Sequence, residues 1–457
     1  SRPLIEEDRA RRDLASGSLP RQILGLSLPS ILEFALFSVG GLLHAFWMGR
    51  VGDLALAAVT MGTSLRIVLI SPMMGLSAGG MAVVARRCGA DDTRRADHAT
   101  MQAVLLIVFF VVPLAILGQV MGPTFLRWMG AKEKVLQDAT AYLRIIFGGL
   151  LFMETLPSMN GVIRGAGYPE YTLRINVVSI VVTALVEALL VLGLGPFPAL
   201  GVRAAGWASV LGSASGVMAQ FLVLLGGKAG VRLHWRDLQP DLEVMKQILR
   251  VAIPTTAQRF SPNLTNALLM KLVAYLGNDV LAAYSVVSRL IGFLRCVPMG
   301  VGNVTATMVG QNLGAGKPER AQRAVELATI GGVLGTLLLL GGLNLRPAVV
   351  LGFFNLPPAA MQVALVATGY ATLSVGGMGW FLIVSRALAG AGDALSPMLV
   401  NMGALWLVQL PLCWLLSVKV GLGHVGVWIG LVVSYLVSGA AMTLRFRQGY
   451  WKHIKIE

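Results

Sequence analysis

The fold class follows from stretches such as AVLLIVFFVVPLAIL, which occupies residues 103–117 and contains no charged side chain. A second uncharged run covers Ile330–Leu343. A helix of about 20 apolar residues spans a bilayer core, and backbone amides in lipid must be bonded within the segment or in a closed barrel. Barrel strands alternate in polarity over about 10 residues, and these runs do not. The sequence therefore predicts an all-α polytopic membrane protein.

Composition agrees with lipid as the solvent. Of 457 residues, 56% are hydrophobic and 13% are charged, whereas soluble domains carry about 25% charged residues. The net charge is +15, but basic residues stand in short clusters between apolar runs, which argues against a nucleic-acid partner. The cysteines Cys88, Cys296 and Cys413 have no metal-ligand spacing. We expect reduced, structural thiols, and neither a metal nor a cofactor.

Twelve apolar segments are long enough to be membrane spans. They cover approximately residues 23–48, 55–84, 99–121, 140–163, 171–193, 204–226, 248–276, 281–310, 324–345, 361–385, 397–418 and 425–445. An even number of spans places both chain ends on one side. Basic clusters adjoin that side, among them Arg9–Arg12, Lys317–Arg323 and Arg445–Lys455, so the positive-inside rule predicts cytoplasmic ends. Ser1–Arg21 lacks the apolar core of a signal peptide.

The second half of the chain repeats the first at a displacement of 225 residues. Without a gap, Gly52–Ala58 (GDLALAA) falls on Gly277–Ala283 (GNDVLAA), and the Gly-Ala-Gly of residues 165–167 falls on that of residues 390–392. Two halves of six spans keep the same orientation, as in transporters built from parallel repeats. The repeat therefore favours a transporter over a channel or a membrane enzyme.

Five segments follow from the spans and the repeat. They are a cytoplasmic N-terminal segment (1–22), a first six-helix bundle (23–226), a cytoplasmic linker (227–247), a second six-helix bundle (248–445) and a cytoplasmic C-terminal tail (446–457). A membrane-bound enzyme or signalling protein is the alternative from another class. The sequence contains no nucleotide loop, metal cluster or nucleophile motif that would favour it.

Motifs at equivalent places in the two halves carry a family resemblance. Leu276–Tyr284 (LGNDVLAAY) and Gly310–Ala321 (GQNLGAGKPERA) resemble the second-half signature of the multidrug and toxic compound extrusion (MATE) family. Met48–Gly52 (MGRVG) resembles its first-half partner, and the two Gly-Ala-Gly sequences resemble its repeated cytoplasmic turn. The similarity extends from about Gln22 to Arg447 and is closer to the prokaryotic DinF-type pattern than to the NorM type.

The resemblance implies two six-helix bundles that form a V around a central cavity. It also implies export of small organic, often cationic, compounds in exchange for a cation by alternating access. We accordingly expect a monomer in contact with membrane lipid, located in a bacterial or archaeal inner membrane. A flippase for amphipathic or lipid-linked substrates is the second use of such a fold.

Ionisable side chains at membrane depth are costly and usually functional. The acids at such depth are Glu33, Glu154 and Glu187, all in the first half, whereas the second half has basic residues such as Arg259 and Arg295. We therefore expect the cation-coupling groups in the first half.

Glu187 has the strongest support among these acids. It stands where the resemblance to proton-coupled members implies an aspartate, and Thr183, one turn earlier, falls where such members often have an asparagine. The same resemblance implies an aspartate at position 44. This chain has His44 instead, and a histidine titrates near neutral pH.

Glu33 and His44 lie eleven residues apart and share one helix face, with Phe37 and Gly40 between them. Pro29 matches the kink-forming proline of related chains, and a proline inside a helix removes a backbone hydrogen bond. We hypothesise that protonation of one or more first-half carboxylates removes buried charge and changes the bend at Pro29.

The alternative for each acid is neutralisation by a fixed partner. Arg259 adjoins Gln258, the repeat equivalent of Glu33, and is one candidate. A NorM-type sodium site requires acids where this chain has Pro262 and Met378. Proton coupling is therefore favoured there, and a first-half sodium site built on Glu187 and Thr183 stays open.

The seventh span carries the candidate groups of a substrate cavity. Gln258, Arg259, Asn263 and Asn266 form a polar stripe at helical spacing, and inter-helix hydrogen bonding is the alternative role. Arg295 lies deep in the eighth span. If the two arginines line a cavity, anionic or zwitterionic substrates fit it.

Overall fold

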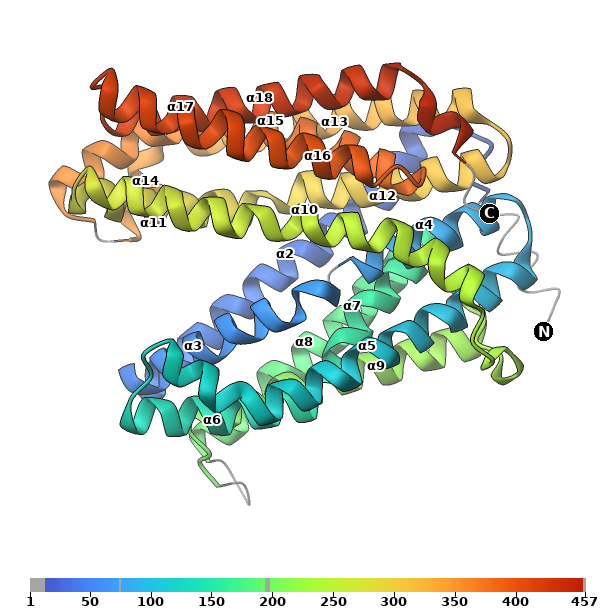
Figure 1. Ribbon diagram of the computed structural model, residues 1–457, viewed down its shortest axis with the longest axis horizontal. Helices are drawn as coiled ribbons and strands as arrows, with labels where there is room; N and C mark the ends of the chain where they lie inside the picture. The colour runs from blue at the N-terminus through green and yellow to red at the C-terminus, as the bar shows by residue number, and fades with distance from the viewer. Residues whose placement is uncertain (1–12, 74, 194–197, 355, 455–457) are drawn as a thin grey trace. The chain divides into compact units, whose positions relative to one another are not determined.

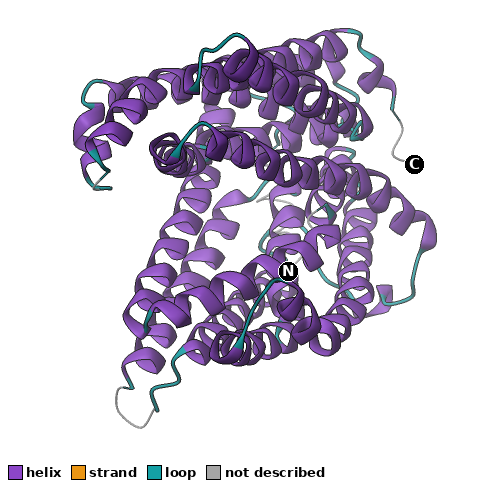
Figure 2. Ribbon diagram, turned by 60° about the vertical axis from the view of Figure 1, so that its left-hand side comes forward, coloured by secondary structure: helices purple, strands orange, loops and turns teal. Residues whose placement is uncertain are grey.

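The computed structural model describes residues 13–73, 75–193, 198–354 and 356–454. These residues form helices joined by loops, and no strand occurs among them (Figures 1 and 2). Parts of the predicted N-terminal segment and C-terminal tail, residues 1–12 and 455–457, lie outside the described residues. The all-α fold class is confirmed.

The described helices divide into two compact units, and the division falls inside two long helices. The first unit contains residues 32–51 of α2 (Leu19–Val51), α3 (Asp53–Ile70), η1 (Ser71–Met73), α4 (Leu76–Gly89), α5 (Thr93–Trp128), α6 (Glu133–Gly148), α7 (Leu150–Gly165), α8 (Pro169–Leu192), α9 (Val202–Leu225), η2 (Trp235–Asp237) and residues 242–253 of α10 (Leu242–Tyr275).

The second unit contains the remaining parts of α2 and α10. Its other segments are α11 (Asn278–Leu294), α12 (Cys296–Gly314), α13 (Pro318–Asn344), α14 (Pro347–Gly352), α15 (Pro358–Gly390), α16 (Leu395–Gly403), η3 (Ala404–Gln409), α17 (Leu410–Trp414), η4 (Leu415–Lys419), α18 (His424–Arg447) and η5 (Tyr450–His453). Residues 23–31, predicted for the first bundle, lie in the second unit, and residues 248–253, predicted for the second bundle, lie in the first. The bundle limits stay a prediction.

Each of the twelve predicted spans coincides with a helix or a run of consecutive helical segments. Within the described residues, ten helices are long and apolar enough to cross a membrane, or eleven if α6 and α7, bent by 55°, count as one. The 34-residue α10 is not among the ten. It is the helix with the polar stripe from Gln258 to Asn266.

The Gly-Ala-Gly motifs have two separate structural roles. The third glycines, Gly167 and Gly392, both have φ of +98°, a backbone conformation that disfavours side chains. The first glycines allow helices to touch: a Cβ at Gly165 would lie 2.6 Å from the carbonyl oxygen of Met81, and a Cβ at Gly390 would lie 2.4 Å from that of Ala306. The repeat therefore preserves a close helix crossing in each unit.

The starts of α2 and α10 are also held in equivalent ways. In the second unit, Arg320 Nη2 donates to Gln22 Oε1 at 3.0 Å. In the first unit, Arg87 Nη2 donates to Gln247 Oε1, also at 3.0 Å. The glutamines are 225 residues apart, so each unit binds the beginning of a helix whose remainder belongs to the other unit.

Candidate functional site

Glu33 is the centre of a buried polar cluster in the first unit. Its Oε1 accepts hydrogen bonds from Arg164 Nη1 at 2.7 Å and from Asn176 Nδ2 at 2.9 Å. Thr172 Oγ1 lies 2.7 Å from Glu33 Oε2 and equally near the carbonyl of Pro169, so one hydroxyl proton serves two acceptors. Glu33 is 2% exposed. These contacts favour the fixed-partner alternative for Glu33, with Arg164 as the partner.

Amide side chains extend this cluster through α7 and α9. Asn160 donates to Asn176 at 3.2 Å, and Gln220 Nε2 donates to Asn160 at 2.8 Å and to the carbonyl of Leu156 at 2.8 Å. All these side chains are buried. A buried carboxylate with an arginine and several donors is a rigid arrangement, because removing any member leaves a polar group unpaired.

His44 and Glu187 form the second ionisable pair of the first unit. His44 Nδ1 lies 2.8 Å from Glu187 Oε1, joining α2 to α8. Glu187 is 1% exposed, whereas the His44 side chain is 24% exposed. Glu187 Oε1 has no aligned hydrogen bond despite this short distance. The pair therefore combines a fully buried carboxylate with a partly exposed imidazole.

Among the remaining first-half candidates, Thr183 lies on α8 with Glu187, whereas Phe37, Gly40 and Pro29 lie along α2. Thr183 donates to the carbonyl of Ser179 at 2.8 Å within its own helix. Phe37 is 46% exposed, and a Cβ at Gly40 would contact Ile180 of α8 at 4.0 Å. α2 continues as a helix through Pro29.

Glu154 faces an arginine that the sequence analysis did not select. Arg66 Nη1 of α3 lies 3.6 Å from Glu154 Oε1 of α7, and both side chains are mostly buried. The distance is longer than that of the Glu33–Arg164 pair, and Arg66 Nε is buried without a hydrogen-bond partner. Each of the three deep acids of the first half therefore has a basic neighbour.

In the second unit, Gln258 takes the place of Glu33 without a charge. Gln258 Nε2 donates to Ser385 Oγ at 2.9 Å, and the backbone carbonyl of Gln258 accepts from Asn401 Nδ2 at 3.0 Å. Neither Gln258 nor the partly buried Arg259 is among the described residues lining the larger cavity of this unit. Their contacts favour the inter-helix role for Gln258.

The larger cavity of the second unit has a volume of about 230 Å³. It contains three predicted substrate residues, Asn263, Asn266 and Arg295, and the two positions where the sodium-type pattern requires acids, Pro262 and Met378. The described residues that line it include no Asp or Glu.

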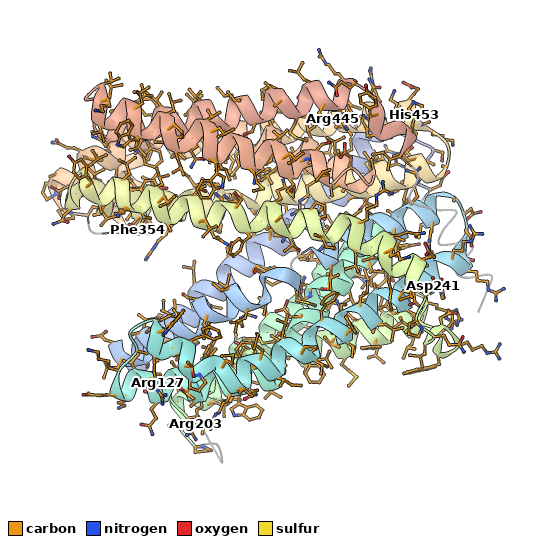
Figure 3. All side chains as sticks on the ribbon, in the orientation of Figure 1. Arg127, Arg203, Asp241, Phe354, Arg445 and His453 are labelled. Atoms are coloured by element: carbon orange, nitrogen blue, oxygen red, sulfur yellow. The ribbon has the colours of Figure 1, made fainter. Side chains whose placement is uncertain are left out.

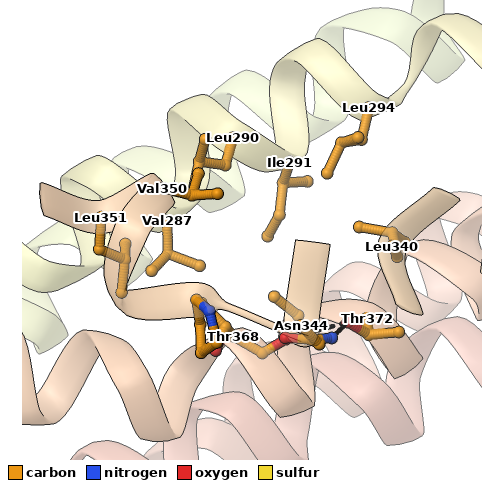
Figure 4. A pocket seen from close by; sticks show the side chains of 12 residues that line it. Val287, Leu290, Ile291, Leu294, Leu340, Asn344, Val350, Leu351, Thr368 and Thr372 are labelled. Carbon is orange, nitrogen blue, oxygen red and sulfur yellow. Dashed lines mark hydrogen bonds between the residues drawn. The ribbon is translucent and has the colours of Figure 1, made fainter. Parts of the chain in front are cut away.

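A second pocket in the same unit is too small for a substrate. Its volume is about 30 Å³, which is close to the share of one water molecule in the liquid. Figure 4 shows aliphatic side chains around it, with a hydrogen bond between Asn344 and Thr372 as its polar feature.

Sequence reasoning missed Arg164, Arg66 and Gln409. Arg164 directly precedes a Gly-Ala-Gly turn at the end of an apolar span, and a charge at such a position is a detectable signal. Arg66, eleven residues after the start of the second predicted span (55–84), is another charge within an apolar segment. Gln409 gave no signal, because a single glutamine in an apolar span is common.

A family model described as MatE matches the chain twice, over residues 29–189 and 254–415. The chain belongs to the MATE family. The two matches begin 225 residues apart, which agrees with the internal repeat. At the level of the family, the chain is therefore a multi-pass membrane transporter and not an enzyme.

Similar proteins cover nearly the whole chain. A Bacillus subtilis protein named probable multidrug resistance protein YoeA is 26% identical over 99% of this chain and 98% of its own length. A Shewanella oneidensis protein named FAD transporter is 24% identical over 94% and 95%. The solved structure of a multidrug resistance MATE family transporter in an outward-facing conformation is 21% identical, with a TM-score of 0.90 over 97% of this chain and 99% of that one. That likeness supports the same fold.

Proposed function

We propose that this MATE transporter exports organic compounds in exchange for protons, and that His44 and Glu187 are its coupling pair. The observation that carries the proposal is the 2.8 Å contact between a carboxylate that is 1% exposed and an imidazole that is 24% exposed. Histidine changes charge near neutral pH, so this pair offers a proton site at the place where the DinF-type pattern implies two acids.

The chemistry of the pair provides a driving force. With a neutral imidazole, the ionised Glu187 is an uncompensated charge in a buried site, which is strongly unfavourable. One added proton produces an imidazolium–carboxylate pair with no net charge. Loss of that proton restores the net negative charge, which favours a conformation in which water or a cation reaches the carboxylate. The proton therefore biases an equilibrium between two access states.

Glu33 has a different role in this proposal. Its carboxylate accepts hydrogen bonds from Arg164, Asn176 and Thr172. The guanidinium of Arg164 therefore compensates the negative charge of Glu33 without a proton. We assign Glu33 to holding α2 against α7 and α8. The bend at Pro29 then responds to the His44–Glu187 pair, which lies further along the same helix.

The names of relatives support export but leave the cargo open. One relative is named for multidrug resistance and another for FAD, and both match over most of their length. We propose an inner-membrane location with cytoplasmic ends, in agreement with the basic clusters of the sequence. Export rather than lipid flipping is favoured by these names.

The test uses the full chain in proteoliposomes loaded with a fluorescent dye. Ethidium and 6-carboxyfluorescein, one cation and one anion, make the result independent of the charge of the cargo. We expect an imposed pH gradient to drive transport of at least one dye, and a sodium gradient without a pH gradient to drive none. Glu187→Gln should lower the pH-driven rate by about tenfold or more, because the residue can no longer release a proton.

Glu170→Gln is the matched control, because Glu170 lies in the first turn of the same helix, α8. It should keep the rate of the unmodified protein. Full pH-driven transport by Glu187→Gln contradicts the assignment of the coupling pair. Transport driven by sodium alone contradicts proton coupling and favours the sodium alternative at Glu187 and Thr183.

A further inference from the structure

We infer that the larger cavity of the second unit is a binding site for a small organic anion that also carries a hydrogen-bond donor. The inference rests on the proposed export function only in taking this anion to be, or to be part of, the exported compound. Binding itself is a separate property of the cavity.

Arg295 supplies the charge that selects an anion. It stands at the junction of α11 and α12, at the middle of the predicted eighth span, and its side chain is exposed at the cavity. Arg295 has no ion-pair partner among the described residues, and no acid is among those lining the cavity. An arginine at membrane depth is costly without a partner, and its planar fork matches a carboxylate or phosphate with two parallel hydrogen bonds.

Two buried polar groups of the same cavity lack hydrogen-bond partners. Gln409 Oε1 and Ser374 Oγ have none, although the residues are only 4% and 2% exposed. A buried polar atom without a partner is unfavourable, and both residues line the cavity. Gln409 Oε1 can only accept, so its missing partner is a donor. A ligand that satisfies the cavity therefore has an anionic end and a hydroxyl or amino group.

The backbone around Gln409 supports a dedicated site. Residues 404–409 form a π-helical turn between α16 and α17. Such turns are uncommon and occur frequently at functional sites. The first-half equivalent of this stretch lies inside α8, which is regular from Pro169 to Leu192. The irregular turn is therefore specific to the copy that has the cavity.

The size and aromatic lining describe the rest of the ligand. The cavity of about 230 Å³ is smaller than the range of about 300–1,000 Å³ that drug-sized ligands occupy. Tyr284 and Trp428 line it with ring centroids 5.5 Å apart, and Tyr284 donates to Asn266 at 3.2 Å. An aromatic anion with one ring fits this space, as a whole compound or as the end group of a larger one.

The binding test uses three compounds of nearly one shape and different charge. They are 4-aminobenzoate, 4-aminobenzamide and 4-aminobenzamidine, which are anionic, neutral and cationic. Calorimetry on the full chain in phosphatidylcholine nanodiscs, without any gradient, measures their affinities. We expect the anion to bind about tenfold or more tightly than the amide, because hydrogen bonds to a charged partner contribute more than neutral ones. Equal affinities, or tightest binding of the amidine, overturn the inference.

Arg295→Gln should lower the affinity for the anion about tenfold to 100-fold and leave the affinity for the amide unchanged. Arg289→Gln is the matched control, because Arg289 is an exposed arginine of α11, the helix that Arg295 follows, and does not line the cavity. It should bind the anion as the unmodified protein does. Anion binding that is insensitive to Arg295→Gln in a folded protein, or equally sensitive to Arg289→Gln, overturns the inference.

A second variant keeps the test decisive if Arg295→Gln fails to fold. Gln409→Leu removes the acceptor, so it should weaken 4-aminobenzoate several-fold more than benzoate, which lacks the amino donor. An equal effect on both ligands contradicts the predicted donor. The result is independent of the transport assay, because Glu187→Gln should bind 4-aminobenzoate normally while failing to transport.

A lipid headgroup is the other source of an anion in a membrane. Nanodiscs that contain phosphatidylglycerol distinguish the two sources. The assignment of a soluble anion is overturned if 4-aminobenzoate does not bind in pure phosphatidylcholine while phosphatidylglycerol alone stabilises the protein in an Arg295-dependent way. Binding of 4-aminobenzoate in both lipids supports it.

Discussion

The two halves of the chain share a backbone plan and differ in their buried charges. Asn176 and Asn401 are repeat equivalents, and each donates to the residue at the Glu33 position of its own unit, to a carboxylate in the first and to the backbone of Gln258 in the second. Both copies therefore have this asparagine hydrogen bond, but only the first copy has an acid and an arginine at the same place.

The difference is larger at the pair that we propose for coupling. His44 and Glu187 of the first half correspond to Leu269 and Leu412 of the second. The cavity that contains Leu269 has an arginine in place of acids. The two copies therefore differ in buried charge, and the two proposals assign proton chemistry to one copy and anion recognition to the other.

The largest expected effect concerns the Glu33 cluster. Arg164→Met leaves a carboxylate with 2% exposure and without its cation, which should cost about 3–5 kcal/mol of stability. Gln258→Met, at the uncharged equivalent, should cost only about 1 kcal/mol, the net value of one hydrogen bond. Unfolding by SDS in mixed micelles measures both.

A double variant separates charge from packing. Glu33→Leu added to Arg164→Met should recover most of the lost stability, because both buried charges are then absent. If Arg164→Met is no more destabilising than Gln258→Met, the two copies do not differ in the way described.

An intermediate effect follows from placing an acid in the second copy. Leu412→Glu should destabilise the protein by about 2.5 kcal/mol, the cost of a charge within a membrane helix. Leu412→Met, which changes shape without adding charge, is the control and should cost less than about 1.5 kcal/mol. If the backbone alone determines whether a His–Glu pair forms, adding Leu269→His to Leu412→Glu should recover part of the lost stability in the same unfolding assay. No recovery would mean that neighbouring residues determine it.

The smallest effect concerns Asp241, which directly precedes α10 (Figure 3). Burial acts to raise the pKa of Asp241, but hydrogen bonds from the amides of Val244 and Glu243 and from His98 outweigh it and lower the pKa. Asp241→Ala should cost about 1 kcal/mol or less at pH 7. Because the folded pKa is lowered, this contribution exists above about pH 4 and is lost as the pH falls further. A cost that persists at pH 3 contradicts the charge-based explanation.

Apolar runs were sufficient to predict the helices, because lipid permits few other backbone arrangements. The repeat and its glycines predicted the tight turns. Two features needed the structure: the extension of α10 back to Leu242, and the π-helical turn at residues 404–409. The start of α10 depends on Asp241, whose carboxylate accepts hydrogen bonds from the amides of Glu243 and Val244. The π-helical turn lies in an apolar segment that does not distinguish it from an α-helix.

The candidate site was predictable as a set of residues but not as pairs. Glu33, Glu154 and Glu187 are visible as acids in apolar spans. Which base approaches which acid depends on helices far apart in sequence: Arg164 is 131 residues from Glu33. The proposed division of labour between Glu33 and Glu187 therefore depends on tertiary contacts that no local pattern encodes.

Residues 14–31 pack in the second unit and residues 242–253 pack in the first, which has a consequence for expressing the two halves separately. A fragment that ends in the linker lacks Ile248 and its neighbours, whose backbone packs on Gly79 so closely that an added Cβ would lie 2.3 Å away. If the two halves were translated separately, each would lack a helical segment that is encoded in the other half and packs against it. We therefore expect neither half to fold alone. A circular permutant opened between residues 226 and 241 should keep both packing contacts, provided that its original ends are joined.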